Sequence, residues 1–208
     1  MSEVKLVAAT PDAERLIAYM ARVSNPENQH NDRTAPKLLK YLIDNQHWSP
    51  FEMVNVVMEI ETTRDIARQI LRHRSFSFQE FSQRYAQSSV FELSECRLQD
   101  EKNRQNSLPT EDRELMRWWQ ESQQGVLRAA QRSYESALSQ GIAKEVARKV
   151  LPEGLTMSRM YMNGTLRSWI HYCDIRCDEA TQKEHRDVAI KCRKIISDLF
   201  PSLEIENA

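Results

Sequence analysis

The sequence predicts an α+β fold, in which a helical core packs with an antiparallel sheet. Two short stretches rich in apolar and β-branched residues, Val4–Ala9 and Glu52–Glu61, favour strands. Most other apolar residues recur at intervals of three and four, which gathers them on one face of a helix. A chain of 208 residues can bury a substantial core, so we expect residues 1–208 to form a single domain.

Two helices are expected between these strands. Thr10 as N-cap and Pro11 at the first helical position predict the start of one helix, and Pro26 follows its end. Thr34 and Pro36 predict the start of the second helix. Each helix has a single apolar face, so both are interpreted as scaffold.

A third helix is expected over Thr63–Arg72, directly after the second strand. Its Arg64, Arg68 and Arg72 recur every four residues and therefore line up along one side. The helix would deliver Arg72, His73 and Arg74 at its C-terminal end, where positive charge interacts favourably with the helix dipole. The dipole alone would account for a part of this cationic cluster.

The middle of the chain is polar. Residues Glu92–Asp112 are too many for a tight connection and are interpreted as a mobile loop or lid. A long helix is expected over Thr110–Gln140, although Gly125 inside it costs about 1 kcal/mol of helix propensity. The apolar seam of this helix would form a core or a subunit interface. Its expected inward-facing residues are Leu115, Trp118, Trp119, Val126, Leu127, Ala130, Tyr134 and Ala137.

The C-terminal third is expected to add one strand and three helices. A helix is expected over Gly141–Leu151, closed by Pro152. Thr156–Arg176 is interpreted as a strand that runs into a helix. The last helix is expected from about Glu179 until Pro201 stops it.

Composition narrows the class of partner. The chain has 29 basic and 30 acidic residues, a net charge of −1, which argues against a nucleic-acid or membrane-surface binder. We find no apolar run long enough to span a membrane and no signal-peptide pattern, so a soluble cytoplasmic protein is expected. The four cysteines fit no common zinc spacing, so no metal site is predicted. The four glycines are too far apart to build a phosphate-binding turn.

The most informative stretch is Arg72–Tyr85, which reads R-H-R-S-F-S-F-Q-E-F-S-Q-R-Y. It mixes cations, hydroxyls and a carboxylate with aromatic rings. Arginine forks and hydroxyls bind phosphate oxygens, and aromatic side chains supply hydrophobic walls. The mixture therefore suits a ligand that has both a phosphate and a flat ring. The alternative for such a charged run is a solvated basic loop.

This R-H-R-S run, followed by E-x-S-x-R-Y, closely resembles the signature of flavin-dependent thymidylate synthases. His47–Glu52 (H-W-S-P-F-E) and Ala147–Pro152 (A-R-K-V-L-P) resemble two further segments of that family. The resemblance implies the family's fold and the reductive methylation of dUMP to dTMP, with methylenetetrahydrofolate as carbon donor. FAD reduced by NADPH would be the methylene carrier and hydride source, without a cysteine nucleophile. The resemblance also implies a homotetramer whose chains share active sites.

The same resemblance implies which residues form the site. Arg176 is expected to be catalytic, with its guanidinium at the pyrimidine, and His47 and Trp48 are expected on the folate and nicotinamide side. The residues expected to bind dUMP are Gln69, Ile70, Leu71, Arg72, Glu80, Phe81, Ser82, Gln83, Arg84, Arg148 and Arg176. The residues expected to bind FAD are Ser49, Arg72, His73, Arg74, Glu80, Thr165, Leu166, Arg167 and His171.

Two other classes of protein stay open as alternatives. A thymidylate synthase of the cysteine-dependent kind would need a nucleophile next to the uracil, yet none of the four cysteines follows a proline as expected there. A nucleic-acid or nucleotide-binding module without catalysis would also use arginine and aromatic side chains. Such a module would hold no chromophore, so a bound flavin separates it from the enzyme.

Overall fold

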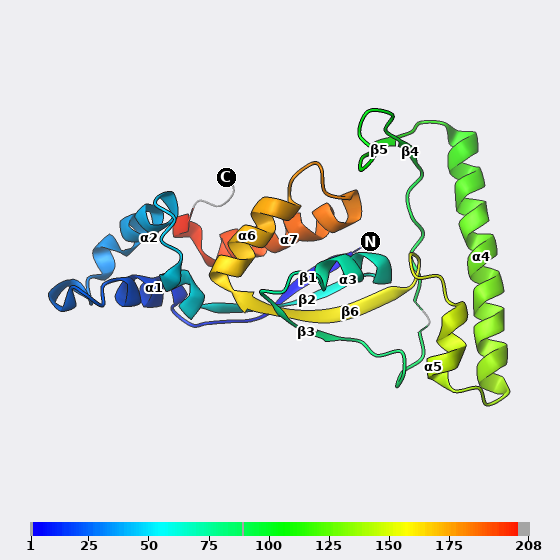
Figure 1. Ribbon diagram of the computed structural model, residues 1–208, viewed down its shortest axis with the longest axis horizontal. Coiled ribbons are helices and arrows are strands. Elements are labelled where there is room, and N and C mark those ends of the chain that lie inside the picture. Colours follow the sequence, from blue (N-terminus) through cyan, green and yellow to red (C-terminus); the bar gives the residue numbers. More distant parts are fainter. Residues whose placement is uncertain (1, 89, 204–208) are drawn as a thin grey trace.

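The computed structural model describes residues 2–88 and 90–203 and has the predicted α+β architecture. Its centre is a four-stranded antiparallel sheet in the order β1-β2-β6-β3 (Figure 1). The strands of this sheet are β1 (Glu3–Ala9), β2 (Asn55–Thr63), β6 (Met157–Thr165) and β3 (Ser77–Glu80).

Helices cover one face of the sheet and both ends of the molecule. The helices α6 and α7 lie together above the strands, α1 and α2 lie at one end, and the long α4 stands at the other (Figure 1). The helices are α1 (Ala13–Ala21), α2 (Ala35–Asp44), α3 (Arg64–Ile70), α4 (Arg113–Ser139), α5 (Lys144–Ala147), α6 (Leu166–Arg176) and α7 (Lys183–Leu199). Short 3-10 segments are η1 (Pro26–Asn28), η2 (Asp32–Thr34), η3 (Ser49–Met53), η4 (Arg148–Val150) and η5 (Pro201–Leu203). Among the described residues, no helix combines the length and the apolar composition needed to cross a membrane.

The core lies between the sheet and α6 and α7. Burial alternates along β2 and β6, and the pairs Met58–Met162 and Ile60–Met160 lie opposite each other across the two strands. These side chains are fully buried, as is Trp169 on α6. The indole N–H of Trp169 donates to the Val56 carbonyl at 3.0 Å, which ties α6 to β2. The central strand β2 thereby holds α6 in a fixed position.

The predicted first helix has a different start. Thr10 is not its N-cap, because its hydroxyl accepts from the Asn55 amide at 3.0 Å and so joins β1 to β2. Asp12 occupies the cap position at a φ of 49°, and the helix begins at Ala13. Because the Thr10 hydroxyl is hydrogen-bonded to a neighbouring strand, it does not cap the helix. The local sequence alone could not predict this contact with a distant residue.

The interpretation of Glu92–Asp112 as a loop or lid is wrong for part of this stretch. It contains a two-stranded antiparallel sheet of β4 (Arg97–Gln99) and β5 (Ser107–Pro109). The turn between these strands is built on the Asp100 carboxylate, which accepts from the Lys102 and Asn103 amides. Hydrogen bonds from the Asp100 side chain, and not an apolar pattern in the sequence, therefore order this turn.

The long helix α4 differs from the prediction in which side chains it buries. Trp118 is 60% exposed and Val126 is 54% exposed, so neither faces the core of this chain. The buried residues are Gln123, Ala130 and Tyr134. Part of the predicted apolar seam, with Trp118 and Val126, thus faces outward, whereas Ala130 and Tyr134 face inward.

Two C-terminal helices are shorter than expected. Gly141 has a φ of 81°, which ends the preceding turn, and α5 covers only Lys144–Ala147 before the 3-10 segment η4. Before α7, the Asp178 carboxylate accepts from the Ala180 amide and holds a turn, so the helix begins at Lys183 rather than near Glu179. The predicted strand and helix over Thr156–Arg176 are confirmed as β6 and α6.

Candidate active site

The R-H-R turn lies directly after α3. The His73 amide donates to the Ile70 carbonyl at 3.0 Å and the Phe76 amide donates to the His73 carbonyl at 3.2 Å, so the turn is ordered by its own backbone. Arg72 and Arg74 are exposed, and within residues 2–88 and 90–203 neither side chain has a carboxylate or hydrogen-bond partner. His73 between them points the other way and is half-buried.

Arg176 at the end of α6 meets His73. Its Nε donates to His73 Nε2 at 2.9 Å, and the His73 ring lies edge-on to Tyr172 at 4.9 Å between centroids. Burial, together with the Arg176 charge, lowers the pKa of His73. A neutral imidazole that accepts at Nε2 must carry its proton on Nδ1. The structure thus brings the predicted catalytic arginine onto the central residue of the predicted flavin motif.

A second cluster forms where η3 meets the start of α6. Arg167 Nη1 donates to Glu52 at 2.6 Å, and the Thr165 hydroxyl donates to the other carboxylate oxygen at 2.8 Å. The Arg167 hydrogen bond lowers the pKa of Glu52, so this carboxylate stays charged at neutral pH. His171 lies against Trp48 at 4.7 Å between ring centroids.

Four predicted residues, Trp48, Thr165, Arg167 and His171, are therefore neighbours within this cluster. Ser49 begins η3 beside them, and Leu166 is fully buried beneath as the first residue of α6. The Ser168 hydroxyl donates to the Ser75 carbonyl at 3.5 Å, which links the cluster to the R-H-R turn. Glu52 is the organising residue that the predicted set missed, although it ends the H-W-S-P-F-E segment.

A third group lines a cationic cavity of about 210 Å³ at the N-terminal end of α3. Gln83 and Arg148, both predicted to bind dUMP, lie there. Gln83 is 4% exposed, and its Nε2 has no hydrogen-bond acceptor among the described residues. A buried donor without an acceptor is costly, so this cavity suits a ligand that offers an acceptor. One carboxylate, Glu153, lines it too and pairs with Arg64 and Arg68, so the cations still outnumber the carboxylates and favour an anionic ligand. The predicted set missed three further cations of this cavity, Arg64, Arg68 and Lys149.

Of the remaining predicted residues, Gln69, Ile70 and Leu71 lie at the end of α3. Glu80 ends β3, and the chain after it runs away from the R-H-R turn and toward α5 (Figure 1). Arg84 Nε pairs with Glu145 at 3.1 Å, and both side chains are more than half exposed. Glu80 accepts from Ser158 at 2.7 Å and from Arg64 at 3.4 Å, so here it orders the sheet edge. The Phe81 amide donates to the Arg159 carbonyl and the Ser82 carbonyl accepts from the Tyr85 amide. Arg84 thus lies apart from the Arg176–His73 pair.

Three of the cysteines lie near the end of α6. Cys173 and Cys192 are buried, and burial raises the pKa of the Cys192 thiol. The neighbouring Cys173 thiol lowers the pKa of Cys177 below that of an ordinary thiol. Cys177 follows Arg176 directly, so it is the cysteine to test as a nucleophile.

Known proteins resemble the whole chain. The family model described as "Thymidylate synthase complementing protein" (Thy1) matches residues 5–202. A flavin-dependent thymidylate synthase of Synechocystis sp. is 53% identical over 190 residues, which are 91% of this chain and 87% of that protein. A probable flavin-dependent thymidylate synthase of Paramecium bursaria Chlorella virus 1 is 50% identical over 95% of this chain and 92% of its own length.

A solved structure of a nucleotide methylase has a similar fold. The UMP/dUMP methylase PolB of Streptomyces cacaoi, bound with 5-Br dUMP, superposes with a TM-score of 0.86 at 25% identity. The superposition covers 99% of this chain and 94% of PolB. The α+β architecture is therefore shared along nearly the whole length of both proteins.

Proposed function

The chain belongs to the flavin-dependent thymidylate synthase family, and on that premise we propose how its residues methylate dUMP. In this proposal residues 1–208 act as one catalytic domain, methylenetetrahydrofolate donates the carbon and NADPH reduces FAD. Bound FAD would supply the hydride and carry the one-carbon group. The observation that supports the proposal best is the contact between Arg176 and a neutral His73.

We propose that Arg176 lies at the uracil edge. C5 of uracil is a poor nucleophile, and it attacks an electrophilic carbon only when negative charge can develop on O4 and N3. A fixed guanidinium there stabilises that charge more in the transition state than in the ground state. His73 holds the Arg176 Nε–H through its lone pair, which leaves the remaining N–H donors of Arg176 for the pyrimidine.

The free cations fit the anionic parts of the ligands. Arg72 and Arg74 are exposed and without protein partners in the described part of the chain, which suits the pyrophosphate of FAD. Ser49, Thr165, Arg167 and His171 would hold the same cofactor from the Glu52 cluster. Gln83 and Arg148 would bind the dUMP phosphate in the cationic cavity, where the unpaired Gln83 Nε2 gains an acceptor.

We propose that the complete site contains residues of several chains in a homotetramer. Arg84 and the cationic cavity are separated from Arg176 within one chain, although all are expected to contact one nucleotide. The exposed seam of α4, with Trp118 and Val126, supplies an apolar surface for such assembly. Light scattering should give a mass near four times 24.4 kDa, and a fully active monomer would contradict this assignment.

The function is tested by the colour and the product of the purified protein. We expect a yellow protein whose flavin absorbance bleaches when NADPH is added with dUMP. Addition of methylenetetrahydrofolate should then yield dTMP, detected by chromatography. A protein that binds dUMP but carries no flavin and forms no dTMP would support a nucleotide-binding module instead.

The phosphate contacts give a prediction of their own. Arg84→Ala and Arg148→Ala should each weaken dUMP binding about 10- to 100-fold, because each loses a charge-assisted hydrogen bond of about 1.5–3 kcal/mol. Titration calorimetry measures the dissociation constant, and the flavin content serves as control because it should not change. Normal dUMP affinity in either variant would remove that arginine from the phosphate site.

A further inference from the structure

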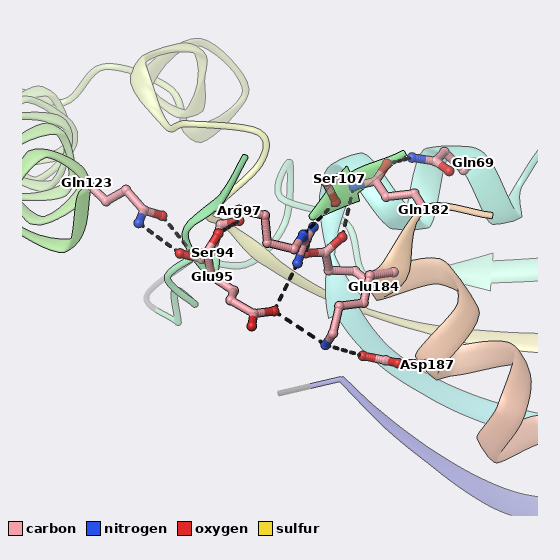
Figure 2. A network of polar contacts seen from close by, with 10 residues as sticks. Gln69, Ser94, Glu95, Arg97, Ser107, Gln123, Gln182, Glu184 and Asp187 are labelled. Atoms are coloured by element: carbon pink, nitrogen blue, oxygen red, sulfur yellow. Dashed lines mark hydrogen bonds and ion pairs between the residues drawn. The ribbon is translucent and has the colours of Figure 1, made fainter. Parts of the chain in front are cut away.

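A chain of side-chain hydrogen bonds runs from the core beside Arg176 to the β4–β5 arm, and Figure 2 shows its outer part. His185 on α7 is fully buried. Its Nε2 contacts the Tyr172 hydroxyl at 3.1 Å, and its Nδ1 contacts the side-chain amide oxygen Oε1 of Gln69 at 3.4 Å. Gln69 Nε2 donates to Gln182 at 2.8 Å. Gln182 Nε2 donates to Glu184 at 3.1 Å, and Glu184 also accepts from Arg97 of β4 at 2.6 Å.

This relay comprises Tyr172, His185, Gln69, Gln182, Glu184 and Arg97. The direction of every hydrogen bond between Glu184 and Tyr172 follows from the Glu184 carboxylate. A carboxylate can only accept, so Gln182 must turn its NH₂ group to Glu184 and its carbonyl oxygen to Gln69. Gln69 must then turn its NH₂ group to Gln182 and its own oxygen to His185. That oxygen needs a donor, which places the His185 proton on Nδ1 and leaves Nε2 to accept from Tyr172.

His185 can fill this role only as a neutral imidazole. It is 0% exposed, and burial, with the charge of Arg176 and the nearby His73, lowers its pKa to about 4. It therefore keeps one donor and one acceptor at neutral pH, as the relay requires.

Gln69 is the one member of the relay among the residues expected to bind dUMP. Its NH₂ group has two N–H donors, and only one of them is taken by Gln182 in the part of the chain that the structure describes. We propose that the relay, terminated by the Arg97–Glu184 ion pair, fixes Gln69 as a hydrogen-bond donor to a phosphate oxygen of the nucleotide. The proposal rests on dUMP as the substrate, and it makes Arg97, Gln182, Glu184 and His185 positioning residues.

The relay also gives the β4–β5 arm a part in the site. Arg97 is the single cation that the arm places on Glu184 in the described structure, and its Nε donates to Ser107 on the neighbouring strand at 2.8 Å. The arm thereby fixes the carboxylate that sets the direction of all the bonds behind it (Figure 2).

Glu184→Gln tests the relay because the new side chain is isosteric. Arg97 would hold its oxygen, so its NH₂ group would face Gln182, and each amide behind it would have to rotate. His185 should then switch its proton from Nδ1 to Nε2, which ¹⁵N NMR of the imidazole nitrogens detects without any substrate. Gln69 would present an oxygen to the phosphate, so dUMP affinity should fall tenfold or more, while deoxyuridine, which lacks the phosphate, should bind as before.

Glu95→Gln is the matched control. Glu95 also pairs with Arg97, at 3.1 Å, but lies outside the relay, so this variant should keep both the Nδ1 proton and the dUMP affinity. If Glu184→Gln does not fold, Gln182→Ala cuts the relay at an exposed residue and should lower dUMP affinity several-fold. An unchanged His185 tautomer in Glu184→Gln overturns the relay, and a switched tautomer with unchanged dUMP affinity overturns the donor role of Gln69. Failure of the wild-type protein to bind dUMP would instead overturn the proposed function, because the tautomer is measured without substrate.

Discussion

Replacing Arg176 with alanine is expected to leave flavin bound while removing most of the methyl transfer to dUMP. The side chain lies at the end of α6, touches His73 and takes no part in the Glu52 cluster, which Arg167 forms. Loss of a fixed donor aimed at developing negative charge typically costs about 2.7–4 kcal/mol, or roughly 10²- to 10³-fold in rate. Single-turnover formation of dTMP by pre-reduced enzyme measures this step apart from flavin reduction.

Two further variants make the Arg176 prediction specific. Arg176→Lys should stay severely impaired, because lysine supplies charge but cannot both hold His73 and offer a planar fork to the ring. Cys177→Ser changes the neighbouring residue and should retain turnover, since no cysteine serves as nucleophile in the proposal. Near-normal dTMP formation by Arg176→Ala would remove it from the mechanism, and loss of all activity in a folded, yellow Cys177→Ser would favour a cysteine-dependent one.

Local patterns in the sequence were sufficient to predict the elements that carry the site. The alternation in Glu52–Glu61 and the helical spacing after Thr63 predict β2 and α3, whose observed bounds are Asn55–Thr63 and Arg64–Ile70. β2 starts later than predicted because Glu52 and Met53 belong to the 3-10 segment η3. These elements are recognisable because their apolar residues face a core that local periodicity already describes.

Features that depend on distant side chains could not be predicted in this way. The order of the β4–β5 arm comes from Asp100 within a polar stretch and from Arg97 reaching Glu184 on α7. The exposed apolar residues of α4, Trp118 and Val126, repeat with the same helical period as buried ones, so periodicity cannot distinguish a core from an interface. His185 resembles any histidine in a charged helix until α6 and α3 are placed beside it.

Gly164→Ala on β6 is expected to disorganise the R-H-R turn through Phe76. A Cβ at Gly164 would lie 2.4 Å from two ring atoms of Phe76, well inside contact distance. Phe76 cannot yield easily, because it is 8% exposed and packs against Trp169 at 4.9 Å between centroids. Its amide holds the His73 carbonyl, so a displaced ring moves the turn that carries the flavin motif.

Overpacking of this kind costs about 1–3 kcal/mol, so the melting temperature should fall by roughly 2–12 °C for a chain of this size, and flavin content should fall with it. Gly125→Ala is the matched control, because a Cβ there meets no atom within 4 Å and should add about 1 kcal/mol of helix propensity.

A double-mutant cycle of Gly164→Ala with Phe76→Ala isolates the contact between these two residues. The double variant should be less destabilised than the sum of the two single variants, because the ring that clashes with the new methyl group is gone. Strict additivity would show that Gly164 is required for the strand backbone and not for its contact with Phe76.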